Sequence, residues 1–174
     1  MAILKIAKMG HPVLLKKAKK VEDPTTPEIK QLVSDMLETL SDLGGSGVGL
    51  AAPQVHVSLQ VVIFETSSSE NKKPILTALI NPKIEALTDE TSIDWEGCLS
   101  IPGLRGQVVR PNKIKYSGLG LDGKKIETIA EGFDARVVQH ECDHLLGILY
   151  PHRMTDLSSL QFVSEARHWI NQDE

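Results

Sequence analysis

The chain has 174 residues, of which 41% are hydrophobic and 24% are charged, as in an ordinary globular protein. This length predicts a single domain over residues 1–174 with a substantial core. The net charge of −4 at pH 7 is too small to favour a nucleic acid or an anionic membrane as partner. No apolar run approaches the roughly 20 residues of a membrane-spanning helix, and no signal-peptide pattern opens the chain, so we expect a cytoplasmic protein.

The first predicted helix covers residues 27–43. Thr26 can cap it, a proline suits its first position, and its apolar residues recur at helical spacing. Gly44 and Gly45 end the pattern. We expect this helix to bury one apolar stripe and to serve as scaffold.

A glycine-rich segment follows, in which Gly47, Val48 and Gly49 precede residues 50–54. Glycine lets a backbone come close to a ligand or to another chain. The spacing does not match a dinucleotide-binding or phosphate-binding loop. From spacing alone, the segment is either a connector or part of a binding site.

Several short segments rich in β-branched residues predict strands. They are residues 60–64, 75–80, 83–87, 107–110, 113–121 and 124–129. Asn81-Pro82 separates the second segment from the third, and Asp122-Gly123 is a favoured turn that makes a hairpin of the last two.

The second strong helix covers residues 133–146 and carries the pattern His-Glu-x-x-His. His140 and His144 share one helix face, so both can bind one divalent metal ion. Glu141 lies close enough to move a proton of a water on that ion. Cys142 is turned about 200° from His140, so we expect it to pack in the core.

A last helix is predicted from Asp156 to about residue 170, with an apolar face that includes Leu157 and Val163. The chain then ends in the acidic residues 171–174. Together these elements predict an α+β fold, in which mostly antiparallel β-sheets pack around a central metal-binding helix, with one further helix toward each end.

The metal site needs a third protein ligand, because catalytic metals usually keep three ligands and one water. A third histidine six residues after His144 is excluded, since Tyr150 stands there. Glu165 would give a thermolysin-like zinc peptidase. Cys98, in the turn-rich residues 95–103, is the other candidate and the favoured one.

Two further alternatives stay open at this point. A structural metal site would usually need a fourth protein ligand, which is not evident. Cys98 could instead act as a nucleophile with a histidine as base.

Three stretches together resemble the three signature motifs of peptide deformylases, in the same order and at typical separations. They are residues 47–54, 96–100 and 139–144. The resemblance extends over essentially the whole chain. It implies a metallohydrolase that removes the formyl group from the N-terminal formylmethionine of newly made proteins.

The resemblance also implies a role for the candidate metal ligands. Cys98, His140 and His144 would bind one divalent ion, with water as the fourth ligand. Glu141 would accept a proton from that water and later return it to the departing amine. Because thiolate is a soft ligand, Fe²⁺ is the expected native ion, with Zn²⁺, Ni²⁺ or Co²⁺ as alternatives.

Further residues receive roles from the same resemblance. The Gln54 side-chain amide and the Leu99 N–H would donate to the oxyanion. The backbone from Gly47 to Gly49, with Val48 between them, would hold the substrate as an added strand. Gly97 would also belong to the substrate site. Phe133 and Val137, alongside Val48, would form an apolar pocket for the methionine side chain. Arg110 and Asp143 would orient the metal ligands.

The implied partners are N-formylmethionyl nascent peptides. In some bacterial members of the family a basic C-terminal helix docks on the ribosome. Here residues 171–174 are acidic, so the sequence leaves a ribosome contact open.

Overall fold

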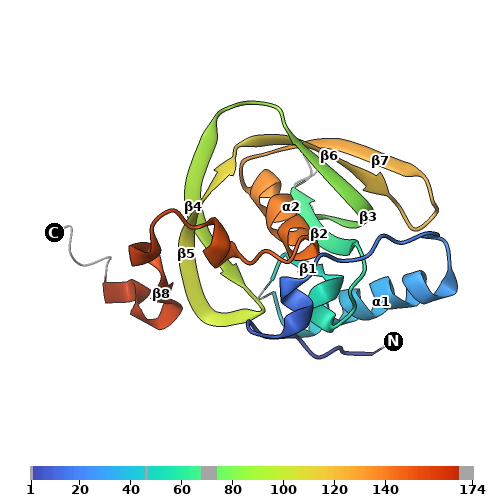
Figure 1. The fold of residues 1–174 in the computed structure, drawn as a ribbon, viewed down its shortest axis with the longest axis horizontal. Coiled ribbons are helices and arrows are strands. Elements are labelled where there is room, and N and C mark those ends of the chain that lie inside the picture. Colours follow the sequence, from blue (N-terminus) through green and yellow to red (C-terminus); the bar gives the residue numbers. More distant parts are fainter. Residues whose placement is uncertain (1, 46, 68–73, 169–174) are drawn as a thin grey trace.

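A computed structural model of the chain describes residues 2–45, 47–67 and 74–168. These residues form two antiparallel sheets and two α-helices, α1 (Pro27–Asp42) and α2 (Gly132–Leu145). Figure 1 shows α2 in the middle of the molecule with strands around it, and α1 toward the edge. The α+β fold with a central helix is therefore confirmed. Among the described helices, none is both long and apolar enough to cross a membrane.

The larger sheet has five strands in the order β1-β2-β3-β6-β7, and every neighbouring pair is antiparallel. Its strands are β1 (Gly49–Ala51), β2 (Val61–Ser67), β3 (Pro74–Ala86), β6 (Lys113–Leu119) and β7 (Lys125–Glu131). The smaller sheet has the order β4-β5-β8, with strands β4 (Thr91–Cys98), β5 (Ile101–Pro111) and β8 (Gln161–Phe162). The predicted hairpin around Asp122-Gly123 is confirmed as β6–β7.

Five short 3₁₀ helices complete the described elements. They are η1 (Pro12–Leu15), η2 (Ala52–Val55), η3 (Tyr150–Arg153), η4 (Leu157–Ser159) and η5 (Val163–His168). The element η2 comes directly after β1 and holds Gln54, so the glycine-rich segment leads straight into a short helical turn.

Helix α2 is held in place by an apolar face that packs on the larger sheet. Val138 and Leu145 of the helix are buried in one cluster with Phe64 and Ile114 of the sheet. Cys142 belongs to the same cluster, which agrees with its expected packing role. The opposite side of the helix is thereby left to polar residues.

Helix α1 begins and ends as the sequence predicts. The Thr26 side chain accepts a hydrogen bond from Ile29 N at 3.4 Å, and Gly44 follows the helix with φ of +61°. Its buried residues, among them Val33 and Met36, pack in a second cluster with residues of β1 and β2. Helix α1 therefore supports the sheet edge that leads to the glycine-rich segment.

The predicted break at Asn81-Pro82 is wrong, because β3 runs without interruption from Pro74 to Ala86. The strand accommodates the two residues as an irregularity in its pairing with β6, with Asn81 at φ of +52°. The Asn81 side chain makes two hydrogen bonds with the backbone of Val21, at 2.8 and 2.9 Å. These bonds stabilise a conformation that the sequence alone suggests is a turn.

The predicted long C-terminal helix is also wrong over the described residues. Asp156 caps only η4, and the chain then forms β8 and η5. Leu157 is 65% exposed and Val163 is 52% exposed, so they form no buried helix face. Residues 169 and 170 of the predicted helix, and the acidic end after them, lie outside the described residues.

Candidate active site

Three candidate metal ligands meet where the end of β4 approaches α2. The ligand atoms of Cys98, His140 and His144 all lie within 4.8 Å of one another. Cys98 Sγ is 3.4 Å from His144 Nε2. Helix geometry brings the two imidazoles together, and Cys98 is the last residue of β4.

This arrangement fits a tetrahedral ion. At the usual bond lengths to such an ion, sulfur and nitrogen ligands lie about 3.5 Å apart. Burial lowers the pKa of His144 well below its usual range, so this ring stays neutral as a ligand must be. Burial also lowers the pKa of His140, but hydrogen bonds with Cys98 and Glu96 outweigh this and raise it to about 10. A bound metal ion would replace that proton.

Glu141 lies beside the cluster with its carboxyl group almost out of contact with water. The residue is 5% exposed, and burial raises the pKa of its carboxyl group to about 7. Its Oε2 atom is buried without a hydrogen-bond partner among the described residues. A carboxyl group in this state can take up and release a proton near neutral pH.

The orientation of the Gln54 side chain is set by its neighbours. Its Oε1 atom accepts a hydrogen bond from Ala51 N at 2.8 Å. The Nε2 donor group is therefore directed to Ser100 Oγ at 3.3 Å and Cys98 Sγ at 3.5 Å. The amide N–H₂ group thus lies next to Cys98, the candidate metal ligand that comes from β4.

The N-terminal arm connects two of the predicted motifs. Ala7 N donates to Gln54 O at 2.7 Å, and Met9 N donates to Ser100 O at 2.8 Å. Between them, Lys8 Nζ donates to the carbonyl oxygen of Leu99 at 3.0 Å. The arm therefore fixes the turn that holds Leu99 relative to Gln54. Sequence reasoning gave these arm residues no role.

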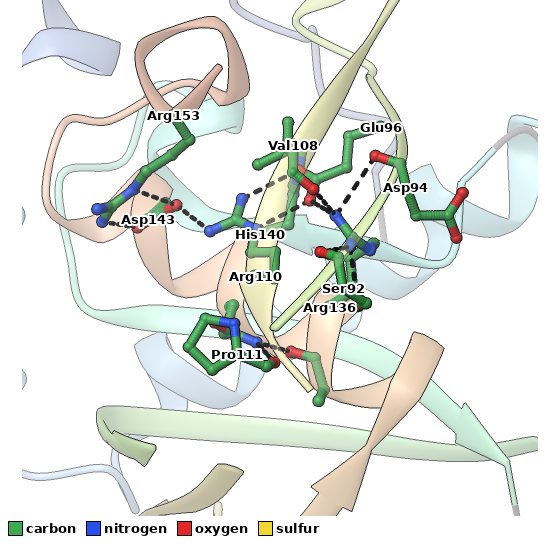
Figure 2. Close-up of polar contacts among 12 residues, drawn as sticks. Ser92, Asp94, Glu96, Val108, Arg110, Pro111, Arg136, His140, Asp143 and Arg153 are labelled. Carbon is green, nitrogen blue, oxygen red and sulfur yellow. Dashed lines mark hydrogen bonds and ion pairs between the residues drawn. The ribbon is translucent and has the colours of Figure 1, made fainter. Parts of the chain in front are cut away.

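A buried network of alternating charge supports the ligands (Figure 2). Glu96 accepts two hydrogen bonds from Arg110, both at 2.9 Å, and one from Arg136 at 2.8 Å. Glu96 Oε2 is also 2.8 Å from His140 Nδ1. Arg110 continues the network to Asp143 at 2.5 Å. Arg110 and Asp143 are therefore connected through Glu96 to His140, one of the candidate metal ligands.

Glu96 is ionised in this network. Burial would raise its pKa, but hydrogen bonds from Arg110 and His140 hold the pKa of the carboxyl group well below its usual range. At the far end of the network, Arg153 donates to both carboxylate oxygens of Asp143, at 2.6 and 3.1 Å. The sequence placed Glu96 in a motif but gave it no task, and it did not single out Arg136 or Arg153.

A cavity of about 570 Å³ opens in front of Cys98, His140 and Glu141. All six residues that the sequence assigned to substrate binding line it, namely Gly47, Val48, Gly49, Gly97, Phe133 and Val137. Leu43, Trp95, Ile101 and Val163 line it as well, and sequence reasoning missed them.

Two glycines in this lining approach neighbouring side chains closely, Gly49 more so than Gly47. A Cβ atom on Gly49 would lie 2.5 Å from Glu141 Oε1, which is closer than real Cβ contacts. A Cβ atom on Gly47 would lie 3.2 Å from the Leu99 side chain. The glycine-rich segment is therefore part of the site and more than a connector.

Comparison with known proteins identifies the family. A family model described as polypeptide deformylase matches residues 3–159. The chain belongs to this deformylase family. Peptide deformylase 1 of Bordetella pertussis is 53% identical to this deformylase over 161 residues, which cover 90% of each chain.

Solved structures agree with this assignment. The Met-Ala-Ser-bound class I type b peptide deformylase from Acinetobacter baumannii has a TM-score of 0.78 and 37% identity, and covers 88% of this chain and 99% of that chain. Its actinonin-bound form has a TM-score of 0.77 and 38% identity, and covers 89% of this chain and 100% of that chain. As a deformylase, the chain is a hydrolase that removes a formyl group and belongs to a metal-dependent family of protein biosynthesis.

The thermolysin-like alternative has no support in this deformylase. Glu165 lies in η5, where it is exposed, and it is not a member of the ligand cluster. The cluster instead contains Cys98, as the favoured reading of the sequence expects. The buried thiol of Cys142 has a raised pKa because of its burial, so it suits the core and not a metal.

Proposed function

We propose that this chain removes the formyl group from the N-terminal formylmethionine of newly synthesised proteins. The proposal rests mainly on the position of Glu141. It lines the same cavity as Cys98 and His140, two residues of the candidate metal cluster. We also propose that residues 1–174 form one catalytic domain, which the family match over residues 3–159 supports.

The proposed metal ligands are Cys98, His140 and His144. When bound, a divalent ion lowers the pKa of a water molecule toward neutrality and so supplies a nucleophile near pH 7. A thiolate beside two imidazoles is a soft set of ligands. We therefore propose Fe²⁺ as the native ion, and expect the same residues to accept Zn²⁺, Ni²⁺ and Co²⁺.

Glu141 is the proposed acid–base group. It would take a proton from the attacking water and later deliver it to the amine that leaves. The pKa of about 7 supports this role, because an acid–base group works best when its pKa is near the operating pH. The unpartnered Oε2 atom leaves one carboxylate oxygen available for the proton.

Gln54 and Leu99 are the proposed oxyanion donors. The bond from Ala51 N to Gln54 Oε1 supports the assignment, since it leaves the Gln54 N–H₂ group beside Cys98. The backbone N–H of Leu99 would be the second donor, in the turn between β4 and β5. One such donor typically stabilises a transition state by about 3–4 kcal/mol.

The substrate peptide would add a strand beside β1. This strand is at the edge of the larger sheet and pairs only with β2 among the described strands. Gly47, Val48 and Gly49 line the cavity, and Gly97 offers a further stretch of backbone there. Main-chain pairing of this kind accepts any sequence, which suits an enzyme that acts on many newly made proteins.

Val48, Phe133 and Val137 are the proposed walls of the methionine pocket. Val137 is buried, whereas Phe133 is 59% exposed and lines the cavity as well. The molecule bound to the related deformylase from Acinetobacter baumannii is Met-Ala-Ser, which begins with methionine. This likeness supports a pocket for an N-terminal methionine side chain.

Arg110 and Asp143 are proposed to orient His140 through Glu96. Ligating histidines commonly donate their second ring nitrogen to a carboxylate, which fixes the ring. The 2.8 Å distance from Glu96 Oε2 to His140 Nδ1 supports this role. The two hydrogen bonds from Arg110 hold the Glu96 carboxylate in turn.

The proposed partners are formylated nascent peptides, so we place the enzyme in the cytoplasm, where such peptides are made. The question of a ribosome contact concerns residues 171–174, which lie outside the described residues. A thiol nucleophile is the alternative closest to the geometry, because Cys98 Sγ lies 3.4 Å from His144 Nε2. Activity that resists a metal chelator would favour it.

The deciding experiment is anaerobic purification with metal analysis, followed by measurement of formate release from formyl-Met-Ala-Ser. We expect one metal ion per chain, formate release, and loss of activity with a chelator. Acetyl-Met-Ala-Ser is the matched control and should be a much poorer substrate. Fully metal-loaded protein that releases no formate would defeat the proposal, and cleavage of internal peptide bonds would favour the peptidase.

A further inference from the structure

The proposed metal ligands come from two parts of the fold that share little apolar packing. Helix α2 packs in the cluster with Phe64 and Ile114, and no residue of β4 or β5 belongs to that cluster. The β4–β5 hairpin packs in a different cluster with Leu14 and Tyr150, which contains no residue of α2. Among the described residues, the connection between hairpin and helix is therefore mainly polar.

Arg136 of α2 makes a large part of this polar connection (Figure 2). Its Nη1 group donates to Glu96 Oε1 and to Val108 O, both at 2.8 Å, and its Nη2 group donates to Ser92 O at 2.9 Å. Ser92 and Glu96 belong to β4 and Val108 to β5, so one guanidinium holds both strands. The residue is 4% exposed, which shields these bonds from water.

The contacts of Arg136 with Ser92, Glu96 and Val108 are called the clamp below. They lie close to the proposed metal ligands. Arg136 stands four residues before His140, on the same side of the helix. Glu96, which it binds, stands two residues before Cys98 on the hairpin. The clamp therefore connects α2, one helical turn before His140, to β4, two residues before Cys98.

We propose that Arg136 is a positioning residue that holds Cys98 at its distance from the two metal-binding histidines. The inference rests on the ligand set of the proposed function. Arginine suits the task because its planar, forked group donates in several fixed directions at once. Lysine would keep the charge but could not bridge Ser92, Glu96 and Val108 in the same way.

The test uses the full chain loaded with Co²⁺, because a thiolate ligand gives cobalt a characteristic charge-transfer absorption. The variants are Arg136→Met and Arg136→Lys. In Arg136→Met we expect a weaker or shifted thiolate band and faster Co²⁺ release to a chelator. The release should reflect an affinity about 10- to 100-fold lower, the usual cost of losing a residue that supports metal ligands. Arg136→Lys should lie between this variant and the unchanged protein.

Ile114→Ala is the matched control, because it removes buried contacts between α2 and the sheet without touching the hairpin clamp. It should lower thermal stability and leave the cobalt band and release rate unchanged. The inference is overturned if Arg136→Met keeps the band and rate of the unchanged protein, or if Ile114→Ala alters them equally. If Arg136→Met does not fold, the thiolate band and the rate of Co²⁺ release of Arg136→Lys decide the question.

Failure of the proposed function would look different. An unchanged protein without any thiolate band would mean that Cys98 is not a ligand, and the ligand assignment would fall. If only the proposal for Arg136 is wrong, the thiolate band should be normal in the unchanged protein and in both Arg136 variants.

Discussion

The two sides of helix α2 differ in chemistry and in how they are held. One side is apolar and packs Val138 and Leu145 against the larger sheet. The other side carries His140 and Arg136 and is held to the β4–β5 hairpin by Arg136 and its partners, while Glu141 lies between the two sides in the cavity wall. Burial of apolar surface holds the apolar side in place, whereas a few hydrogen bonds and ion pairs with fixed geometry hold the polar side.

This difference separates stability from chemistry within a single helix. Apolar packing tolerates small shifts, since it has no preferred direction. Metal ligands and proton carriers do not tolerate them, because catalysis depends on fixed geometry. Substitutions on the polar side should therefore lower activity far more than stability, and substitutions on the apolar side should do the reverse.

The largest expected effect is that of Cys98→Ala. The substitution removes one of three proposed ligands, so we expect loss of bound metal and of all measurable formate release. Metal analysis of the purified protein checks this result. Full retention of metal by Cys98→Ala would contradict the ligand assignment and revive Glu165 as a ligand.

Glu141→Gln should separate chemistry from metal binding. The amide keeps the size of the side chain but cannot carry the proton, and positioned acid–base groups contribute about 10²- to 10⁴-fold in rate. We expect a fall in kcat/KM of roughly that size, with metal content and thermal stability nearly unchanged. Activity close to that of the unchanged enzyme would remove Glu141 from the mechanism.

Gln54→Leu tests the proposed oxyanion donor in η2, whose amide group lies beside Cys98. Loss of one such donor typically lowers kcat by about 10²- to 10³-fold. We expect this fall in kcat with little change in KM, as measured by initial rates of formate release. A rise in KM at constant kcat would instead indicate that Gln54 only binds the substrate.

The smallest effect on activity is expected from Val138→Ala, on the apolar side of α2. The residue is fully buried, so truncation should lower the free energy of unfolding by about 2 kcal/mol. Formate release at 25 °C should stay within about 2-fold, because the packing is non-directional and the fold is retained. Denaturant unfolding measures the change in stability, and initial rates of formate release measure the change in activity. A large loss of activity would contradict the proposed difference between the two sides of α2.

The two α-helices α1 and α2 could be predicted from the sequence because their signals are local. Thr26 and the following proline mark the start of α1, and Gly147, with φ of +75°, follows the end of α2. The ligand cluster could also be anticipated, since motif spacing and family resemblance both point to Cys98. Local signals failed, however, at Asn81-Pro82, which lies within β3, and at Asp156, which caps only η4.

The missed features depend on contacts between distant residues. Arg136 meets Glu96 across 40 residues and Asn81 meets Val21 across 60, so no local pattern reports either pair. The single strand β3 depends on the second of these contacts. Glu96 could have been singled out, because metal-binding histidines commonly donate their second ring nitrogen to a carboxylate, and Glu96 supplies one within the motif around Cys98.

Contacts between residues far apart in the chain have a consequence for when the candidate site assembles. Lys8 meets Leu99 across 91 residues, and Cys98 meets His144 across 46. Such distant contacts close large loops and form late, because loop closure costs conformational entropy before any contact repays it. During synthesis the site therefore stays incomplete until His144 has been made and has folded back on segments made much earlier.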